Sequence, residues 1–202
     1  MVKLYVEGAA RDSALDRSLC RQAFANFFSA DPRLKGRLPR TVPCGGRNAA
    51  YDAFVAAVRN PEPGVLPLLL VDSETAVRAE QTVWQHLKSR PDDNWDKPEG
   101  AGDQQVFLMV QVMESWFIAD REALRLFFGA HFREDVIPSW PRLEEAPKPD
   151  VYEALTRSTA ACGPRKYAKG RLSFRLLSMV SPARVEVASP HARALFECLR
   201  TV

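Results

Sequence analysis

The chain has 202 residues, which suits one domain or one domain with a small appendage, and its 46% hydrophobic content suffices for a core. A formal net charge of +3 is too weak to indicate nucleic-acid binding by itself. No run of about 18 uncharged apolar residues occurs, the N-terminal segment turns polar too early for a signal peptide, and the four cysteines lack C-x-x-C spacing. We therefore expect a cytoplasmic protein with no membrane segment, disulfide or zinc site.

The first part of the chain alternates predicted strands with predicted helices. Short apolar runs predict strands at residues 3–8, 41–46, 65–72 and 105–113. Apolar residues spaced three and four apart predict helices at residues 13–29, 48–58, 75–88 and 114–129. Asp12 or Ser13 is expected to cap the first of these helices. The alternation predicts an α/β fold, in which a mostly parallel sheet is flanked by helices through right-handed crossovers.

The remainder of the chain has a different pattern. The segment VIPSWPRLEEAPKPD is rich in proline and irregular, and helical patterns return at residues 151–161, 172–180 and 190–199. We interpret residues 1–130 as the α/β core. Residues 131–202 are then a helical C-terminal extension that packs on this core within one compact unit.

Acidic side chains follow the predicted strands at the points where they end. Glu7 ends the first strand, Asp72 and Glu74 follow the third, and Glu114 follows the fourth, with Asp120 further along the next helix. The carboxyl ends of parallel strands meet at one edge of a sheet, so we expect these carboxylates to lie close together. They repel one another unless a cation lies among them, and carboxylate oxygens suit Mg²⁺ or Mn²⁺. The spacing therefore makes all of these acids candidate metal ligands.

The same acids have a simpler interpretation as helix caps. Asp and Ser often accept hydrogen bonds from the free amides of a helix start, so Asp72 or Ser73 could cap the helix predicted from residue 75. Glu7 fits this interpretation less well, because it closes an apolar strand and precedes Gly8, which permits a close approach of a ligand. From the residues alone, both interpretations stay open.

Basic residues supply candidate phosphate contacts. In CGGRNAAYD, glycine amides and Arg47 lie between a predicted strand and a helix and could bind a phosphate, although an ordinary turn explains the motif equally well. In the C-terminal third, cations could hold a nucleic-acid backbone while Tyr167 stacks on a base, and the alternative is a solvated turn. The candidate cations there are Lys148, Lys166 and Lys169.

Several segments resemble known families. VEG at residues 6–8, followed by Asp12, and VDSE at residues 71–74 resemble the first two motifs of Toprim (topoisomerase–primase) domains, a strand-ending Glu-Gly and a strand followed by Asp-x-Asp. Nearly the whole chain also resembles a bacterial family called domain of unknown function 4276. The segments that carry this second resemblance are YVEG, CGGRNAAYDAF, LLLVDSE, LMVQVMESWFIAD, EEAPKPDVYEAL and KYAKGRLSFRLL.

The resemblance implies a magnesium-dependent Toprim-like fold, of the kind found in nucleases, primases and topoisomerases. By position, Glu7 would be the general acid/base, and Asp72 and Glu74 would bind the metal, with Glu114 as a further acid. Glu74 departs from the usual Asp-x-Asp motif. Its side chain is one methylene longer than that of aspartate, which shifts the metal position.

We therefore expect a nuclease that uses Mg²⁺ or Mn²⁺ to process phosphodiester bonds in DNA or RNA. Related proteins are commonly encoded beside ATPases in phage-defence loci, so the resemblance also implies an AAA- or ABC-type ATPase partner. The alternative is a catalytically inactive adaptor that docks on such an ATPase. In that case the acids would be helix caps or partner contacts.

Overall fold

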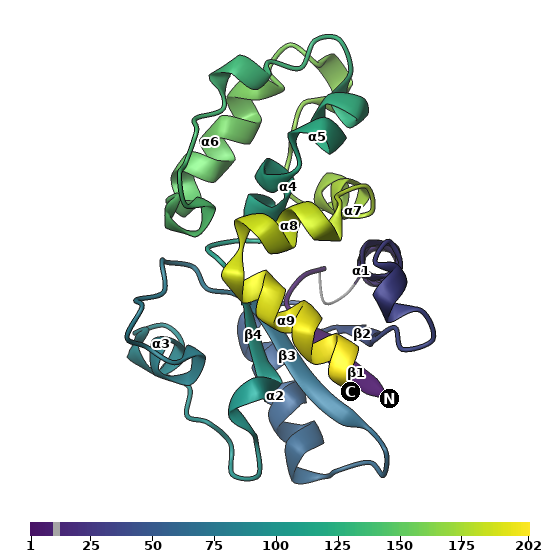
Figure 1. Cartoon of the computed structure of the whole chain (residues 1–202), viewed down its shortest axis with the longest axis vertical. Helices are drawn as coiled ribbons and strands as arrows, with labels where there is room; N and C mark the ends of the chain where they lie inside the picture. Colours follow the sequence, from purple (N-terminus) through teal and green to yellow (C-terminus); the bar gives the residue numbers. More distant parts are fainter. Residues whose placement is uncertain (10–12) are drawn as a thin grey trace.

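The computed structural model describes residues 1–9 and 13–202, and its centre is a parallel sheet (Figure 1). The strands are β1 (Val2–Val6), β2 (Arg40–Pro43), β3 (Leu66–Asp72) and β4 (Val106–Met109). They lie in the order β2-β1-β3-β4, and every neighbouring pair is parallel. After β1 the chain forms β2 on one side of it and then crosses to form β3 on the other side. The direction in which strands are added therefore reverses between β1 and β3. The predicted parallel α/β architecture is thus confirmed.

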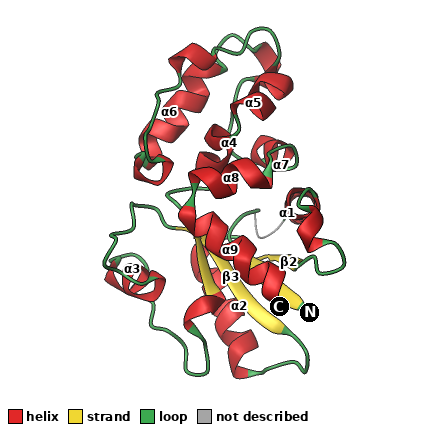
Figure 2. Cartoon of the chain, in the orientation of Figure 1, coloured by secondary structure: helices red, strands yellow, loops and turns green. Residues whose placement is uncertain are grey.

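Helices cover both faces of this sheet (Figures 1 and 2). The covering helices are α1 (Ala14–Ser29), α2 (Arg47–Arg59), α3 (Val83–Ser89) and α9 (Pro190–Thr201). Successive strand residues point to opposite faces. Leu68 and Leu70 therefore pack with α1 and α9, whereas Leu69 and Val71 pack with α2 and α3. This two-sided burial explains why β3 is a continuous apolar run.

Helix α3 begins later than the sequence predicts. Thr82 accepts a hydrogen bond from the backbone of Gln85 at 3.2 Å, and Gln85 returns one to the backbone of Thr82 at 2.8 Å, which forms a capping box. Residues 75–82 are not helical, so the expected helix at 75–88 is wrong over its first half. Asp72 and Ser73 therefore do not cap α3. The cap predicted for α1 is confirmed for Ser13, which accepts from the backbone of Asp16 at 3.0 Å, and Asp12 lies outside the described residues.

The single helix predicted over residues 114–129 is two helices. They are α4 (Glu114–Ala119) and α5 (Arg121–Phe128). Asp120 separates them with non-helical backbone angles, and its side chain accepts a hydrogen bond from the backbone of Ala123 at 3.1 Å. Asp120 is therefore the N-cap of α5. Gly129 ends α5 with a φ of 78°, as the sequence predicts.

The C-terminal part is helical, with short 3₁₀ turns across the proline-rich segment. Its helices are α6 (Lys148–Ser158), α7 (Arg171–Leu177), α8 (Pro182–Ala188) and α9. The sequence did not predict α8, which starts at Pro182, with four residues (178–181) between it and the end of α7 at Leu177. Helix α7 packs on α1, α6 and α8 pack on α4, and α9 packs on β4. Within the described ranges, every helix is too short or too polar to cross a lipid bilayer.

An aromatic cluster joins the C-terminal helix to the α/β part. The ring of Phe196 on α9 lies 5.6 Å from the rings of Phe27 and Phe28 on α1, measured between centroids. Trp116 of α4 stacks on Phe27 at 5.3 Å and is fully buried, as expected for a core residue. The cluster therefore fixes three segments that are far apart in the sequence.

Replacing Phe196 by alanine is expected to lower the free energy of unfolding by about 3–5 kcal/mol, because it removes a buried ring and leaves a cavity. Urea unfolding of the variant measures this loss. Phe196→Leu is the matched control and should lose less, since it keeps most of the buried volume. A loss below about 1 kcal/mol in the alanine variant would contradict the packing of α9 on the core.

Candidate metal centre

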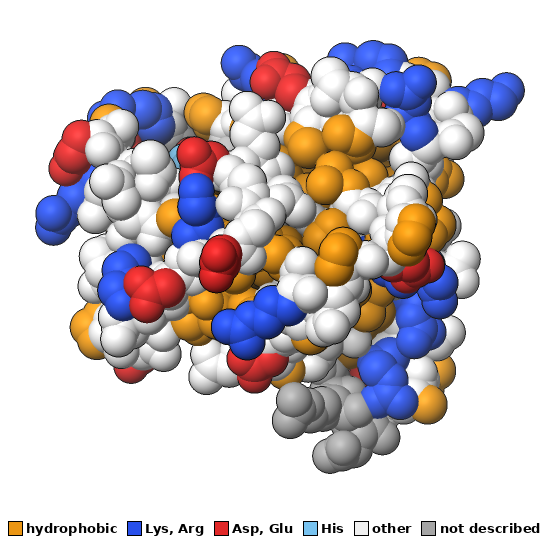
Figure 3. Space-filling view, turned by 90° about the horizontal axis from the view of Figure 1, so that it is seen from below, with side chains coloured by type: hydrophobic (Ala, Val, Ile, Leu, Met, Phe, Trp, Pro, Cys, Tyr) orange, Lys and Arg blue, Asp and Glu red, His pale blue; other side chains and the backbone are white. Residues whose placement is uncertain are grey.

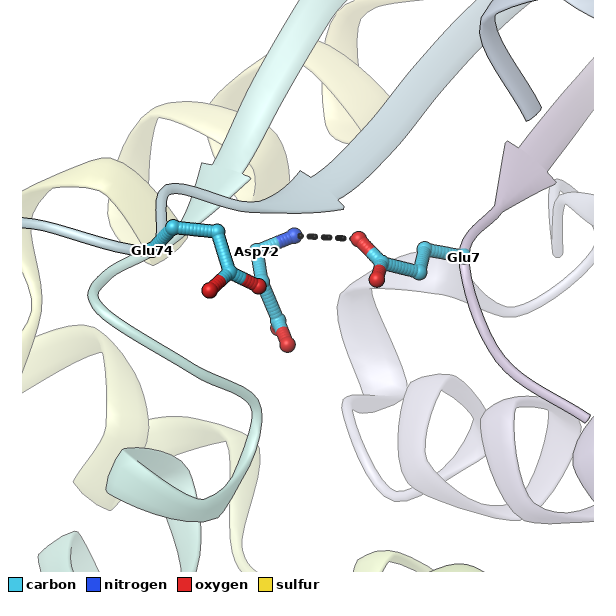
Figure 4. Close-up of side chains that lie close together, drawn as sticks. All are labelled: Glu7, Asp72 and Glu74. Carbon is cyan, nitrogen blue, oxygen red and sulfur yellow. Dashed lines mark hydrogen bonds between the residues drawn. The ribbon is translucent and has the colours of Figure 1, made fainter. Parts of the chain in front are cut away.

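The candidate site lies at the carboxyl end of the sheet, where the strand order reverses. Glu7 directly follows β1, Asp72 is the last residue of β3, and Glu74 comes two residues later (Figure 4). The backbone amide of Glu7 donates to the carbonyl of Leu70 at 3.2 Å, which keeps Glu7 beside β3. In open parallel sheets, ligands bind in the crevice outside such a reversal point.

The structure brings Glu7, Asp72 and Glu74 together. Each offers a carboxylate oxygen, and these oxygens lie within 4.8 Å of one another. Glu7 Oε2 accepts a hydrogen bond from the backbone amide of Asp72 at 3.3 Å. Asp72 is 6% exposed, and its Oδ1 accepts from the amide of Met113 at 2.8 Å, whereas its Oδ2 has no hydrogen-bond donor in the described part of the chain. Asp72 therefore keeps one carboxylate oxygen available to a cation in the pocket that it lines.

Two of these carboxyl groups resist ionisation. Burial raises the pKa of Asp72 well above its usual range, and the negative charges of Glu7 and Glu114 raise it further. Burial also raises the pKa of Glu7, and the charge of Arg47 offsets this only in part. Hard oxygen donors that repel one another in a small space fit Mg²⁺ or Mn²⁺, which reverse the sign of the local charge.

Arg47, the first residue of α2, is a fixed cation between the acids. Its Nη1 donates to Glu7 Oε2 at 3.2 Å and to the backbone carbonyl of Asp72. Its Nε donates to Asp93 Oδ1 at 3.0 Å and its Nη2 donates to Asp93 Oδ2 at 2.5 Å, which forms a bidentate ion pair. Burial disfavours the charge of Asp93, but Arg47 and Arg90 outweigh it and hold the pKa of Asp93 below its usual range. The sequence suggested Arg47 as a phosphate contact, and here its donors are used to position acids.

Lys148 from the C-terminal part reaches the same site. Its ammonium group donates to Glu74 Oε2. The amide of Lys148 also donates to Gln111 Oε1 at 3.1 Å, while the amide of Glu74 donates to the carbonyl of Gln111 at 2.8 Å. Gln111 therefore ties the start of α6 to the segment that carries Glu74.

Glu114 lies beside the three acids and is held by hydroxyl groups. It is 1% exposed, and its Oε1 accepts from Tyr167 at 2.8 Å and from Ser173 at 3.2 Å. Its Oε2 accepts from Tyr152 at 3.3 Å, and Lys169 donates to the same tyrosine oxygen at 2.9 Å. Tyr167 is only 6% exposed, so the expectation that its ring stacks on a base is wrong.

A pocket of about 150 Å³ opens between these groups. Its lining includes Glu7, Asp72, Glu114, Lys169 and Ser173. The sequence predicted the acids at this place from the strand ends. It did not indicate the contacts of the Tyr152, Tyr167 and Ser173 hydroxyl groups with this site, because single tyrosines and serines carry no signal of their partners in the fold.

Two predicted site residues lie apart from this group. Asp120 Oδ2 accepts from the amide of Ser181 at 2.8 Å, and its Oδ1 caps α5 and contacts Arg184 at 3.2 Å. It is not part of the carboxylate cluster of the described residues, and its contacts are those of a buried cap. Lys166 is exposed on the turn before α7 and does not line the pocket.

Comparison with known families gives a match over residues 6–200, to the family described as domain of unknown function (DUF4276). The chain belongs to the DUF4276 family. The match includes every residue of the candidate metal centre. Comparisons with curated proteins and with solved structures gave no match. The site of this DUF4276 chain is therefore interpreted from its own geometry.

Replacing Asp72 by asparagine is expected to stabilise the metal-free DUF4276 protein at neutral pH, by on the order of 1 kcal/mol. Asparagine keeps the Oδ1 contact with Met113 and removes a buried charge that Glu7 and Glu114 repel. Urea unfolding in the presence of a chelator measures the difference. The exposed substitution Glu99→Gln is the matched control and should change little.

The gain in free energy of unfolding from Asp72→Asn should decrease as the pH falls. Asp72 has a raised pKa in the folded state, so the wild type binds this proton more tightly when folded and loses stability as pH rises through that pKa. The difference between variant and wild type should therefore shrink as pH falls, and vanish below the pKa of an unfolded aspartate. A variant that is less stable than the wild type at neutral pH would show that the Asp72 charge is already compensated.

Arg47→Met is expected to lower the free energy of unfolding by about 3–5 kcal/mol, because it leaves buried carboxylates without their partner. Thermal or urea unfolding measures the loss. Lys88→Met is the control, since Lys88 pairs with Asp96 at the surface. Equal unfolding midpoints for Arg47→Met and wild type would rule out Arg47 as the cation that holds the site together.

Proposed function

We propose that this protein is a Toprim-like, divalent-metal-dependent nuclease that processes phosphodiester bonds of DNA or RNA. The observation that carries the proposal is the meeting of Glu7, Asp72 and Glu74 within 4.8 Å at the reversal point between β1 and β3. Acids after the first and third strands are also the pattern of the Toprim motifs, which supports the finer assignment of the fold.

The proposed roles follow from the contacts of each side chain. Asp72, Glu74 and Glu7 would hold Mg²⁺ or Mn²⁺, and an ion held there supplies Lewis acidity towards a phosphoryl oxygen. Glu7, with its pKa raised by burial, would act as the general acid/base. Glu114 would be a further ligand or would orient the site through its hydroxyl partners.

Among the described residues, two pockets lie at the acids. Glu74 and Arg47 line one of about 590 Å³, whereas Glu7, Asp72 and Glu114 line one of about 150 Å³, which has room for a phosphate group. Lys169 lines the smaller pocket and Lys166 lies on the neighbouring exposed turn, so both are placed to contact phosphates near its opening.

A different face of the molecule suits nucleic acid less well. Seen from below, Lys and Arg side chains are interspersed with Asp, Glu and hydrophobic side chains among the described residues (Figure 3). Most of this face is mixed in charge, although Lys and Arg side chains follow one another along its lower right edge (Figure 3). We place the proposed substrate contacts at the carboxyl end of the sheet, beside the acids.

One observation favours the second candidate, a catalytically inactive adaptor of a cytoplasmic ATPase complex. Arg47 pairs with Glu7, and Lys148 pairs with Glu74. These ion pairs neutralise two of the three acids without a metal, as a purely structural site requires. In either case we propose an AAA- or ABC-type ATPase as the partner in phage defence.

Calorimetric titration with Mn²⁺ and a cleavage assay on mixed DNA and RNA distinguish the two candidates. The enzyme should bind Mn²⁺ at millimolar or lower concentration and cleave in its presence. Glu7→Gln should weaken binding by at least about tenfold, and Asp72→Asn should abolish cleavage while the fold is kept, because both remove a charged oxygen donor. Glu99→Gln, purified identically, should keep its activity and is the control for substitution of an exposed acid, while the inactive Asp72→Asn variant controls for contaminating nucleases.

The adaptor is favoured if the wild type takes up no Mn²⁺. Cleavage that survives in Asp72→Asn would exclude Asp72 as an essential ligand. Binding without cleavage in the isolated chain calls for the same assay with the ATPase partner present.

A further inference from the structure

Lys148 is held at the acidic site by more than its charge. Its ammonium group contacts Glu74, and its own amide donates to the side chain of Gln111 at 3.1 Å. Gln111 is 6% exposed and accepts the amide of Glu74 through its carbonyl at 2.8 Å. Since one buried residue fixes the backbone on both sides of the ion pair, Lys148 and Glu74 are held in place as a unit.

The backbone at Glu74 directs its side chain towards this contact. Glu74 has a φ of 68°, which residues other than glycine rarely adopt. The surrounding hydrogen bonds hold it there, and the carboxylate turns back towards Asp72 (Figure 4). One oxygen of Glu74 is then used by Lys148, while the group remains within 4.8 Å of the other acids.

Of the three acids, the two that flank Asp72 each have a cationic partner. Glu7 has Arg47, and Glu74 has Lys148, as fixed cationic partners. Asp72 has no cationic partner of its own in hydrogen-bond contact in the described part of the chain, although the charge of Lys169 lowers its pKa from a distance. The position that lacks a cation is therefore next to Asp72.

The space also favours a single ion. Two-metal centres hold their ions about 3.5–4 Å apart and need ligands on both sides of each ion. Here the three oxygens lie within 4.8 Å of one another, close enough for one ion, and Lys148 pairs with Glu74. A second ion at Glu74 would meet this positive charge.

We propose that this centre takes one divalent ion, and that the ammonium group of Lys148 supplies the positive charge that a second ion would supply beside Glu74. The inference rests on the proposed function and deepens it. The phosphate of the substrate would lie between the single ion and Lys148. Lys148 is thus a residue of the centre itself, although it belongs to the C-terminal helical part.

The number of bound Mn²⁺ ions tests the proposal without any assay of activity. Calorimetry should give one ion per wild-type chain, and electron paramagnetic resonance should show isolated Mn²⁺ without coupling between ions. Lys148→Met frees Glu74, so a second Mn²⁺ should bind at least about tenfold more tightly than to the wild type and couple magnetically to the first. Lys148→Arg keeps the charge and should still bind one ion.

Two further variants make the result specific. Lys88→Met removes a surface lysine that also pairs with a carboxylate, and it should leave the number of ions at one. Adding Glu74→Gln to Lys148→Met should abolish the second site. Circular dichroism of each variant confirms that it is folded before titration.

The outcomes separate the failure of this inference from that of the proposed function. Two coupled ions in the wild type would overturn the role of Lys148 and leave a metal-dependent nuclease standing. One ion in both wild type and Lys148→Met would also overturn it. A wild type that takes up no Mn²⁺ would overturn the proposed function and this inference with it.

Discussion

The burial of Asp72 beside Glu7 is the constraint on which the rest of the site depends. Burial raises the pKa of both carboxyl groups, and the negative charge of Glu7 raises the pKa of Asp72 further, so the fold must oppose this repulsion locally. Arg47 does so with one planar group that contacts Glu7, the carbonyl of Asp72 and Asp93. A lysine could not make these contacts together, because it lacks the rigid fork of donors. The first residue of α2 is therefore as important to the site as the acids.

The helical C-terminal part completes the site as well as covering the sheet. It supplies Lys148, which pairs with Glu74, and the hydroxyl groups that hold Glu114. Helix α9 packs on β4 and joins the aromatic cluster with α1. A truncation after the α/β part would therefore remove both packing and site residues. Residues 1–130 and 131–202 differ in pattern, but they build one centre.

The sequence allowed the strand ends to be predicted, and with them the meeting of Glu7, Asp72 and Glu74. This worked because a continuous apolar run such as β3 is a strong signal, and parallel topology places strand ends at one edge. The start of α3 was predicted too early because the helical pattern begins at residue 75, whereas the capping box of Thr82 and Gln85 starts the helix at Val83. Asp120 was misplaced because its N-cap role depends on a break in the helix that periodicity does not show.

Long-range partners could not be predicted for a different reason. Asp93 lies in a polar, glycine-rich segment that resembles any surface loop, yet its side chain is 2% exposed and bonded to Arg47. Tyr167 lies among basic residues, which suggested an exposed ring, yet its hydroxyl group donates to Glu114. In both cases the partner is more than forty residues away in the chain. Local pattern gives the elements, whereas such pairs depend on how the elements pack.

Glu74 shows how the departure from an Asp-x-Asp pattern fits the rest of the centre. Its positive φ turns the chain out of the line of β3, so the carboxylate must reach back to lie near Asp72. Glutamate has the additional methylene for this, and its second contact is with Lys148 on a different part of the chain. A shorter aspartate at this backbone geometry would reach less far towards both Asp72 and Lys148. The length of the Glu74 side chain, its positive φ and its contact with Lys148 therefore depend on one another. A change in any one of them would move the carboxylate relative to Asp72 or Lys148.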